Sequence, residues 1–171
     1  MIRDKVVKFK KDTDTLINIK VNPQRRSLKA ILLLLVEPYG RGIREKYIFP
    51  DLTKVSVTIN GSPNTLYNNG IEGKDMWEEA RRFFVKEKTK TENMNLTKFY
   101  TGDKFGLLID MRSMADQTIH GSGARIVNST DGIQLEIERK AVGTGKVNCH
   151  VLVIADSQFN IKDRQLQSVQ F

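Results

Sequence analysis

The sequence predicts an all-β fold, an antiparallel sandwich of about eight strands with one substantial inserted helix at about residues 75–87. Ile133–Glu138 alternates apolar and polar residues, which is typical of a strand with one buried face. Val147–Ala155 is apolar at almost every position, as expected of a strand covered on both sides. Only between Asp75 and Glu87 does the apolar spacing become helical.

The C-terminal part of the chain organises this prediction. Asp131–Phe171 has the pattern of a strand, a glycine turn, a second strand, a further turn and a final short strand. The turn Gly143-Thr144-Gly145 is expected to join the first two strands as a hairpin, for which the other segments supply partners. Because the chain ends on the aromatic Phe171, we expect that end to be held within a strand.

The earlier segments supply further strands. Ser27–Glu37 contains an unbroken apolar run; periodicity alone does not separate a buried helix from a buried strand, but its length and the stop at Pro38 favour a strand. Asn60-Gly61 is the strongest short-range turn signal in the chain. Other strands are expected at residues 6–9, 16–21, 55–59, 105–111 and 124–127, with long loops at 86–104 and 112–123.

Length and composition indicate one domain over residues 1–171, long enough to bury about 70% of the surface of its unfolded chain. No apolar run approaches the ~20 residues of a membrane span, so no membrane partner is expected. The amino terminus lacks the apolar core of a secretory signal. The single cysteine, Cys149, excludes an intrachain disulfide, and a reducing, intracellular compartment fits best.

The net charge of +8 favours an anionic neighbour. The basic residues cluster at Lys8–Lys11, at Arg25-Arg26 and between Arg81 and Lys90. Weak contact with DNA is one interpretation of these clusters, and solvated loops and helix faces are the other.

No constellation in the sequence predicts catalysis. His120-Gly121-Ser122-Gly123 has histidine where a nucleophile elbow requires glycine. Gly143–Lys146 lacks the first glycine and the final Ser/Thr of a phosphate-binding loop. Cys149 and His150 are adjacent on a predicted strand and therefore face opposite sides. We predict a protein that is not an enzyme and has no cofactor and no metal.

Several segments occur in an order that resembles a known family. They are Asn22–Leu28, Phe49–Val55, Ile59–Tyr67, Trp77, His120–Gly123, Asp131–Leu135 and Asp156–Ile161. From about Asp14 to its end, the chain resembles the C-terminal jelly roll of the double-jelly-roll major capsid proteins that Polinton/Maverick elements and adintoviruses encode.

This resemblance implies an eight-stranded jelly-roll sandwich with a structural role. The chain would self-associate through side-to-side contacts into trimers or larger assemblies, together with other capsid proteins. Its location would be the virion capsid, after an intracellular stage in the host cell. Family members carry two rolls in one polypeptide, whereas this sequence contains one, as expected of an excised half or of a single roll captured by a host genome.

Specific interfaces are anchored by aromatic and arginine side chains, and seven such residues lie in or near the predicted loops. The candidate interface residues are Tyr39, Arg41, Arg44, Tyr47, Trp77, Phe99 and Tyr100. For each of them, a place in the core or in solvent is the alternative. The alternative function is a non-enzymatic binding module that holds a sugar or protein ligand in loops 86–104 and 112–123.

Overall fold

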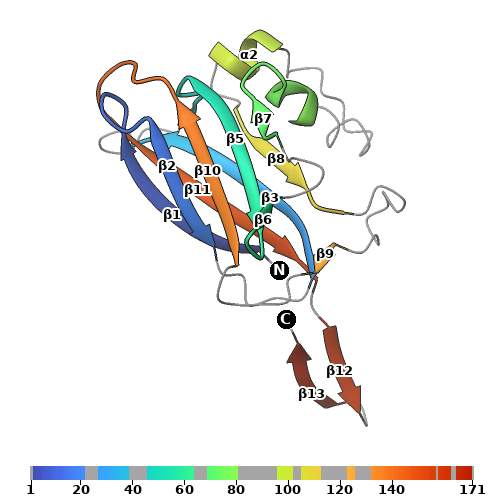
Figure 1. Cartoon of the computed structure of the whole chain (residues 1–171). Coiled ribbons are helices and arrows are strands. Elements are labelled where there is room, and N and C mark those ends of the chain that lie inside the picture. The colour runs from blue at the N-terminus through green and yellow to red at the C-terminus, as the bar shows by residue number, and fades with distance from the viewer. Residues whose placement is uncertain are drawn as a thin grey trace.

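The structure is a computed structural model in which two antiparallel sheets are stacked face to face (Figure 1). This arrangement confirms the predicted all-β sandwich. The described residues are 2–21, 27–38, 46–63, 69–80, 96–101, 105–112, 123–125, 132–156, 158–162 and 165–170.

Two groups of paired strands make up the sandwich. Sheet A consists of β1 (Ile2–Lys10), β11 (Lys146–Ala155), β3 (Ser27–Glu37), β4 (Lys46–Tyr47), β8 (Leu107–Asp110) and β9 (Ala124–Arg125). Sheet B consists of β2 (Leu16–Val21), β10 (Ile133–Arg139), β5 (Leu52–Ile59), β6 (Ser62–Pro63) and β7 (Ile71–Glu72).

The order of the strands is that of a jelly roll. In sheet A the neighbours are β1, β11, β3 and β8, and in sheet B they are β2, β10, β5 and β7. The chain therefore changes sheet between β1 and β2, between β2 and β3, between β4 and β5, between β7 and β8, between β9 and β10, and again between β10 and β11. Such repeated crossing places the two sheets on either side of one core.

The prediction that the Gly143–Gly145 turn joins two neighbouring strands as a hairpin is wrong. β10 pairs with β2 and β5 in sheet B, whereas β11 pairs with β1 and β3 in sheet A. The Gly143–Gly145 turn thus carries the chain from one sheet to the other. Alternation fixes which residues of a strand face the core, but it does not tell whether the next strand lies beside it or across the core.

The core lies between the sheets and is filled from alternate positions of the long strands. On β3, Ile31, Leu33 and Leu35 are fully buried, while Leu32 and Leu34 between them remain partly exposed. On β11 the same alternation holds along the strand. The prediction that β11 is covered on both sides is therefore wrong, because only its inner face is fully buried.

Two local predictions are confirmed. The apolar run at residues 27–37 is strand β3. Asn60 and Gly61 both have positive φ, 52° and 78°, and join β5 to β6 in a two-residue hairpin loop. Positive φ at both central positions defines the type I′ turn for which Asn-Gly is favoured.

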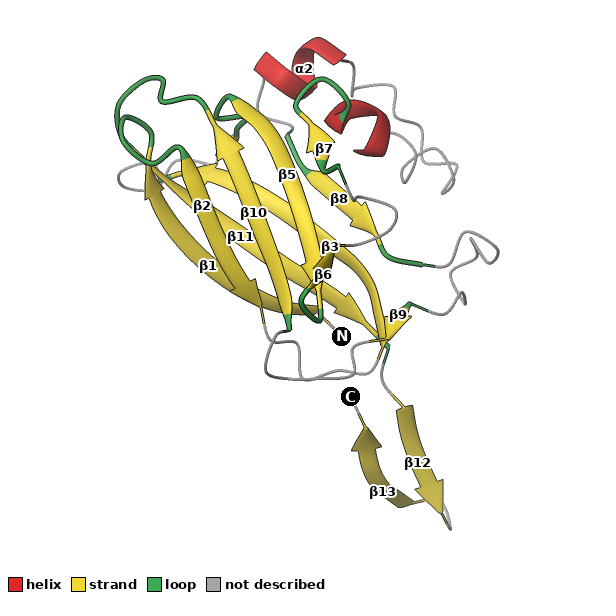
Figure 2. Cartoon of the chain, viewed as in Figure 1, coloured by secondary structure: helices red, strands yellow, loops and turns green. Residues whose placement is uncertain are grey.

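Short helices lie at one end of the sandwich (Figure 2). Residues 76–80 are helical and Asp75 lies in a turn, whereas residues 81–87 of the expected helix lie outside the described residues. Helix α2 (Leu96–Thr101) falls within the segment 86–104, for which the sequence predicts a loop. Six residues are too few to show helical periodicity, so packing rather than pattern accounts for α2.

A small two-stranded sheet stands apart from the sandwich. β12 (Gln158–Lys162) and β13 (Gln165–Gln170) pair only with each other among the described strands. They project from the end of the sandwich where β3 begins (Figure 1). Phe171, expected within a strand, lies outside the described residues.

We expect Gly73→Ala to lower the free energy of unfolding by about 1–3 kcal/mol. A Cβ at Gly73 would lie 2.3 Å from the backbone oxygen of Leu52, and the Gly73 amide donates to Thr53 O over 2.8 Å, so the backbone has to shift. Urea unfolding of Gly73→Ala and of the control Gly106→Ala measures the difference. A Cβ at Gly106 meets the side chain of Leu34 at 3.2 Å, and that side chain is able to rotate. Equal losses in the two variants would contradict the prediction.

Candidate functional site

Five aromatic residues from four segments meet at the helical end of the sandwich, and we call them the cap cluster. The ring centroid of Phe99 lies 5.2 Å from that of Trp77 and 5.0 Å from those of Tyr100 and Phe105. Phe49 lies 4.9 Å from Tyr100 and 5.2 Å from Phe105. The structure thus brings three candidate interface residues together, with two aromatic residues that the sequence does not single out.

The hydroxyl of Tyr100 ties α2 to the segment that precedes helix 76–80. It donates to Gly73 O over 2.7 Å, with Lys74 O at 3.1 Å, and it accepts from the Trp77 amide over 3.1 Å. Burial raises the pKa of Tyr100, although the hydrogen bond from Trp77 opposes the shift. The phenol is therefore neutral at physiological pH and acts as a structural link between the helices.

The candidate interface residues differ in exposure. Phe99 is fully buried, so its side chain belongs to the core and not to the surface. Trp77 and Tyr100 are half-buried against the core. Tyr47 on β4 is 38% exposed, and its backbone oxygen accepts from the amide of Phe105, which places it beside the cap cluster. The three remaining candidates, Tyr39, Arg41 and Arg44, lie outside the described residues.

Replacing Tyr100 with phenylalanine is expected to lower the free energy of unfolding by about 1–2 kcal/mol, because Gly73 O and the Trp77 amide each lose a partner. Thermal and urea unfolding measure the loss. Thr101→Val removes an exposed side-chain bond to Thr97 O within α2 and serves as a control with a smaller expected effect. A Tyr100→Phe variant as stable as the wild type would refute the linking role.

Beside the cap cluster is an open pocket of about 490 Å³. It is lined by Phe49, Asp51, Leu52, Thr53, Glu72, Gly73, Lys74, Tyr100 and Lys140. Within this lining, Lys74 pairs with Glu72 over 3.0 Å, and the hydrogen bond and charge of Glu72 raise the pKa of Lys74. Two aromatic rings together with both signs of charge suit a neutral hydroxylated ligand such as a sugar better than a simple anion.

Arg139 is the buried charged residue of the described core, with 4% exposure. Its Nε donates to Pro50 O over 3.1 Å, and its Nη1 donates to Lys11 O and Asp14 O over 2.9 and 2.7 Å. Burial lowers the pKa of Arg139, while the charges of Asp51 and Asp14 oppose that shift.

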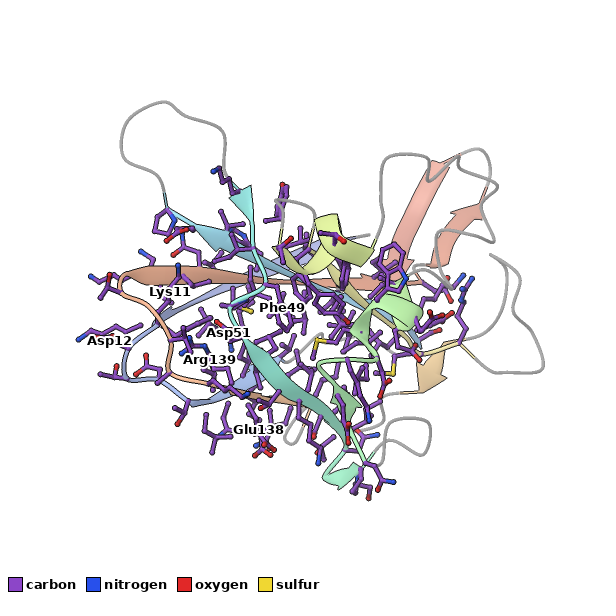
Figure 3. The ribbon with its side chains drawn as sticks, turned by 90° about the horizontal axis from the view of Figure 1, so that it is seen from above. Lys11, Asp12, Phe49, Asp51, Glu138 and Arg139 are labelled. Carbon is purple, nitrogen blue, oxygen red and sulfur yellow. The ribbon has the colours of Figure 1, made fainter. Side chains whose placement is uncertain are left out.

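Figure 3 shows Arg139 next to Asp51, at the end of the sandwich that carries the β1–β2 and β10–β11 connections. The guanidinium joins the connection after β1 to the one before β5, and so it has a structural role. The signal for this role is present in the sequence, because Arg139 continues the alternation of buried positions along β10, after Leu135 and Ile137.

The outer surfaces of the two sheets differ in polarity. On sheet A, five apolar residues at outward positions of β1, β3 and β11 are at least partly exposed, beside the polar outward residues Lys8, Lys10, Asn148 and His150; we call the five apolar residues the sheet A face. Its members are Val6, Leu32, Leu34, Leu152 and Ile154. On sheet B, most outward positions of the described strands are polar, namely Asn18, Lys20, Lys54, Ser56, Thr58, Gln134, Glu136 and Glu138.

The sheet A face makes the outer side of sheet A more apolar than the outer side of sheet B. Leu32 pairs with Leu152 in register, and Val6, which is 45% exposed, pairs with His150. Apolar side chains gathered on a sheet surface mark interaction sites more often than scattered ones do. Sequence reasoning missed this face because it took the outer side of β11 to be covered within the chain.

The remaining sequence candidates are dispersed in the structure. Lys8 and Lys10 on β1 are exposed, whereas Arg25, Arg26 and residues 81–90 lie outside the described residues, as do His120 and Ser122. Cys149 is buried, and His150 is partly exposed on the opposite side of β11.

Within the described ranges, no group of three or more His, Cys, Asp or Glu residues is placed to hold a metal ion. No helix in that part of the chain is long and apolar enough to cross a membrane.

Comparison with known proteins identifies no family for this chain. No protein-family model matches the chain. A search of curated proteins finds no match either.

Proposed function

We propose that this chain is a structural building block that associates with copies of itself through side-to-side contacts between sandwiches. The observation that carries the proposal is the sheet A face, where apolar residues are partly exposed, while most outward positions of sheet B are polar and Leu16, 54% exposed, is the apolar exception. Burying such a face against a second sandwich removes apolar surface from water at about 25 cal/mol per Å².

The resemblance to double-jelly-roll capsid proteins supports the same role. The jelly-roll strand order agrees with what that resemblance implies. In this proposal the chain acts in a capsid, and its partners are other copies and other capsid proteins. Specific protein interfaces bury ~1,600 Å² in total, about half of it from each partner.

Light scattering during size-exclusion chromatography at micromolar concentration tests the proposal. We expect the wild type to form trimers or larger assemblies. Leu152→Lys places a charge on the sheet A face and is expected to shift the population to monomers. Gln134→Lys adds the same charge on the outer side of sheet B and should leave the assembly unchanged. A wild type that stays monomeric at every concentration contradicts the proposal.

The pocket beside the cap cluster favours a second function, that of a non-enzymatic binding module. Phe49 and Tyr100 offer ring surfaces, and Lys140 and Asp51 supply polar groups at its rim. A glycan panel screened by ligand-observed NMR is expected to give one saturable ligand if this function holds. Lys140→Ala should then weaken the binding of that ligand, whereas Lys146→Ala, outside the pocket lining, should not.

A further inference from the structure

A second pocket, of about 230 Å³, lies directly beside the 490 Å³ pocket next to the cap cluster. Phe49, Asp51 and Tyr100 line both pockets, so the two meet along these three residues. From there the second pocket continues to Lys11 and Val142, on the connections that follow β1 and β10. The two pockets therefore form one continuous depression, which we call the groove.

Hydrogen bonds within the chain fix the walls of the groove. Arg139 Nε donates to Pro50 O over 3.1 Å and its Nη1 donates to Lys11 O over 2.9 Å, and both acceptor residues line the second pocket. The Tyr100 hydroxyl donates to Gly73 O over 2.7 Å, and both of these residues line the first pocket. A groove held in this way is formed before a ligand arrives, which lowers the entropy cost of binding.

The lining of the groove is neutral overall. Four of its charges are neutralised in two ion pairs, which are Lys74–Glu72 at 3.0 Å and Lys11–Glu37 at 2.7 Å. Asp51 and Lys140 are the other charged lining residues, and neither forms an ion pair with another described residue. The groove thus offers one carboxylate that accepts hydrogen bonds and one ammonium that donates them, a combination that suits hydroxyl groups.

The backbone groups along the groove already have partners within the chain. The Gly73 amide donates to Thr53 O over 2.8 Å, and the Lys140 amide donates to Asp51 O over 3.0 Å. Gly73 O and Pro50 O each accept a side-chain hydrogen bond. An extended peptide that adds to a sheet binds through free backbone groups of its host. The groove therefore favours a ligand that side chains recognise over a peptide strand.

Asp51 lies where the two pockets meet, and its backbone has a positive φ of 52°. Few residues other than glycine adopt this conformation, and where they do so the strain is often found at ligand sites. The side chain of Asp51 is exposed and lies next to Arg139 (Figure 3). A hydrogen-bond acceptor therefore stands at the point that a ligand spanning both pockets has to pass.

We propose that the groove binds a neutral oligosaccharide with one sugar ring in each pocket, whose hydroxyls donate to Asp51 and accept from Lys140. Phe49 and Tyr100, with ring centroids 4.9 Å apart, supply apolar surface between the two sugars. The inference rests on the proposed function of a binding module, and it names the ligand class and a minimum length of two sugars.

Titration calorimetry with the intact chain tests the ligand class and its length. The neutral probes are the mono-, di- and tetrasaccharides of glucose, mannose, galactose and N-acetylglucosamine. A heparin tetrasaccharide and tetraalanine are the anionic and the peptide counterparts. We expect one neutral series to bind, and its tetrasaccharide to bind at least about 10-fold more tightly than its monosaccharide, because the second pocket adds contacts.

A variant of the second pocket tests whether the longer ligand reaches it. Val142→Arg places a long charged side chain in that pocket, at a position that is 50% exposed. We expect the tetrasaccharide to bind to this variant no more tightly than the monosaccharide, whose own affinity stays unchanged. Leu16→Arg adds the same side chain at a position that is 54% exposed and outside both linings, so it should bind the tetrasaccharide like the wild type.

Variants of Asp51 test the acceptor at the junction. Asp51→Asn keeps the shape of the side chain but not its charge, and we expect tetrasaccharide binding to weaken at least about 10-fold. Asp51→Gly relieves the backbone conformation, so we expect it to bind as weakly while resisting urea at least as well as the wild type. Asp12→Asn, at an exposed position outside both linings, should bind like the wild type. Unchanged affinity in both Asp51 variants would overturn the inference.

The outcomes separate the groove from the binding module. If the monosaccharide and the tetrasaccharide bind equally well and Val142→Arg changes neither, the ligand occupies one pocket, and the groove is refuted while the binding module stands. If heparin tetrasaccharide or tetraalanine binds and the neutral sugars do not, the ligand class is refuted while the binding module again stands. If no probe binds at millimolar concentration, the binding module itself fails, and the groove fails with it.

Discussion

Arg139→Met is expected to lower the free energy of unfolding by about 3–5 kcal/mol. Methionine fills a similar length of space but donates no hydrogen bond. Pro50 O, Lys11 O and Asp14 O, which accept from the guanidinium over 2.7–3.1 Å, then lose their buried partner. These three carbonyls lie on connections between the two sheets, so their lost hydrogen bonds should weaken the sandwich as a whole. Urea unfolding should therefore remain one cooperative transition, with its midpoint at a lower urea concentration.

Two further variants show whether hydrogen bonding is the cause. Arg139→Lys keeps the charge but not the planar fork, so it should recover only part of the stability. Lys140→Met changes the exposed neighbour and is expected to stay within about 0.5 kcal/mol of the wild type. A loss below about 1 kcal/mol for Arg139→Met would mean that the three carbonyls find other partners.

Phe99→Ala is expected to cost about 3–5 kcal/mol of unfolding free energy. Phe99 is fully buried and contacts the rings of Trp77, Tyr100 and Phe105, so truncation leaves a cavity at the centre of the cap cluster. Denaturant unfolding at low protein concentration, where monomers predominate, measures the loss. Phe99→Leu fills part of the cavity and is expected to lose about half as much.

The same pair of variants tests the candidate role of Phe99 as an interface anchor. A core residue alters the stability of the monomer, whereas an anchor alters the association constant and leaves the monomer nearly as stable. A Phe99→Ala chain that unfolds like the wild type but associates more weakly would contradict its place in the core.

Much of the strand framework was accessible from local pattern. Alternation located β2, β5 and β10, the apolar run located β3, and Asn60-Gly61 located a hairpin whose two positive φ angles match its residue types. These predictions succeed because burial on one face and turn conformation depend on residues close together in the chain.

The candidate site was less accessible, because its members come from distant segments. Trp77, Phe99 and Tyr100 are candidates by residue type, yet their meeting with Phe49 and Phe105 depends on how β4–β5 and β8 approach the helices. The buried role of Phe99 follows from the same packing. A six-residue helix such as α2 leaves no periodic signal for the sequence to display.

The sequence by itself determined that the chain forms an all-β sandwich, which residues of β2, β5 and β10 face inward, and where its tightest turn lies. Only the tertiary structure decided that the Gly143–Gly145 turn crosses between sheets, that Arg139 joins the connections at that end, and that apolar residues on the outer side of sheet A stay partly exposed. The physical reason is that alternation reports the burial of single faces, whereas the partner of each strand depends on contacts between segments far apart in the chain.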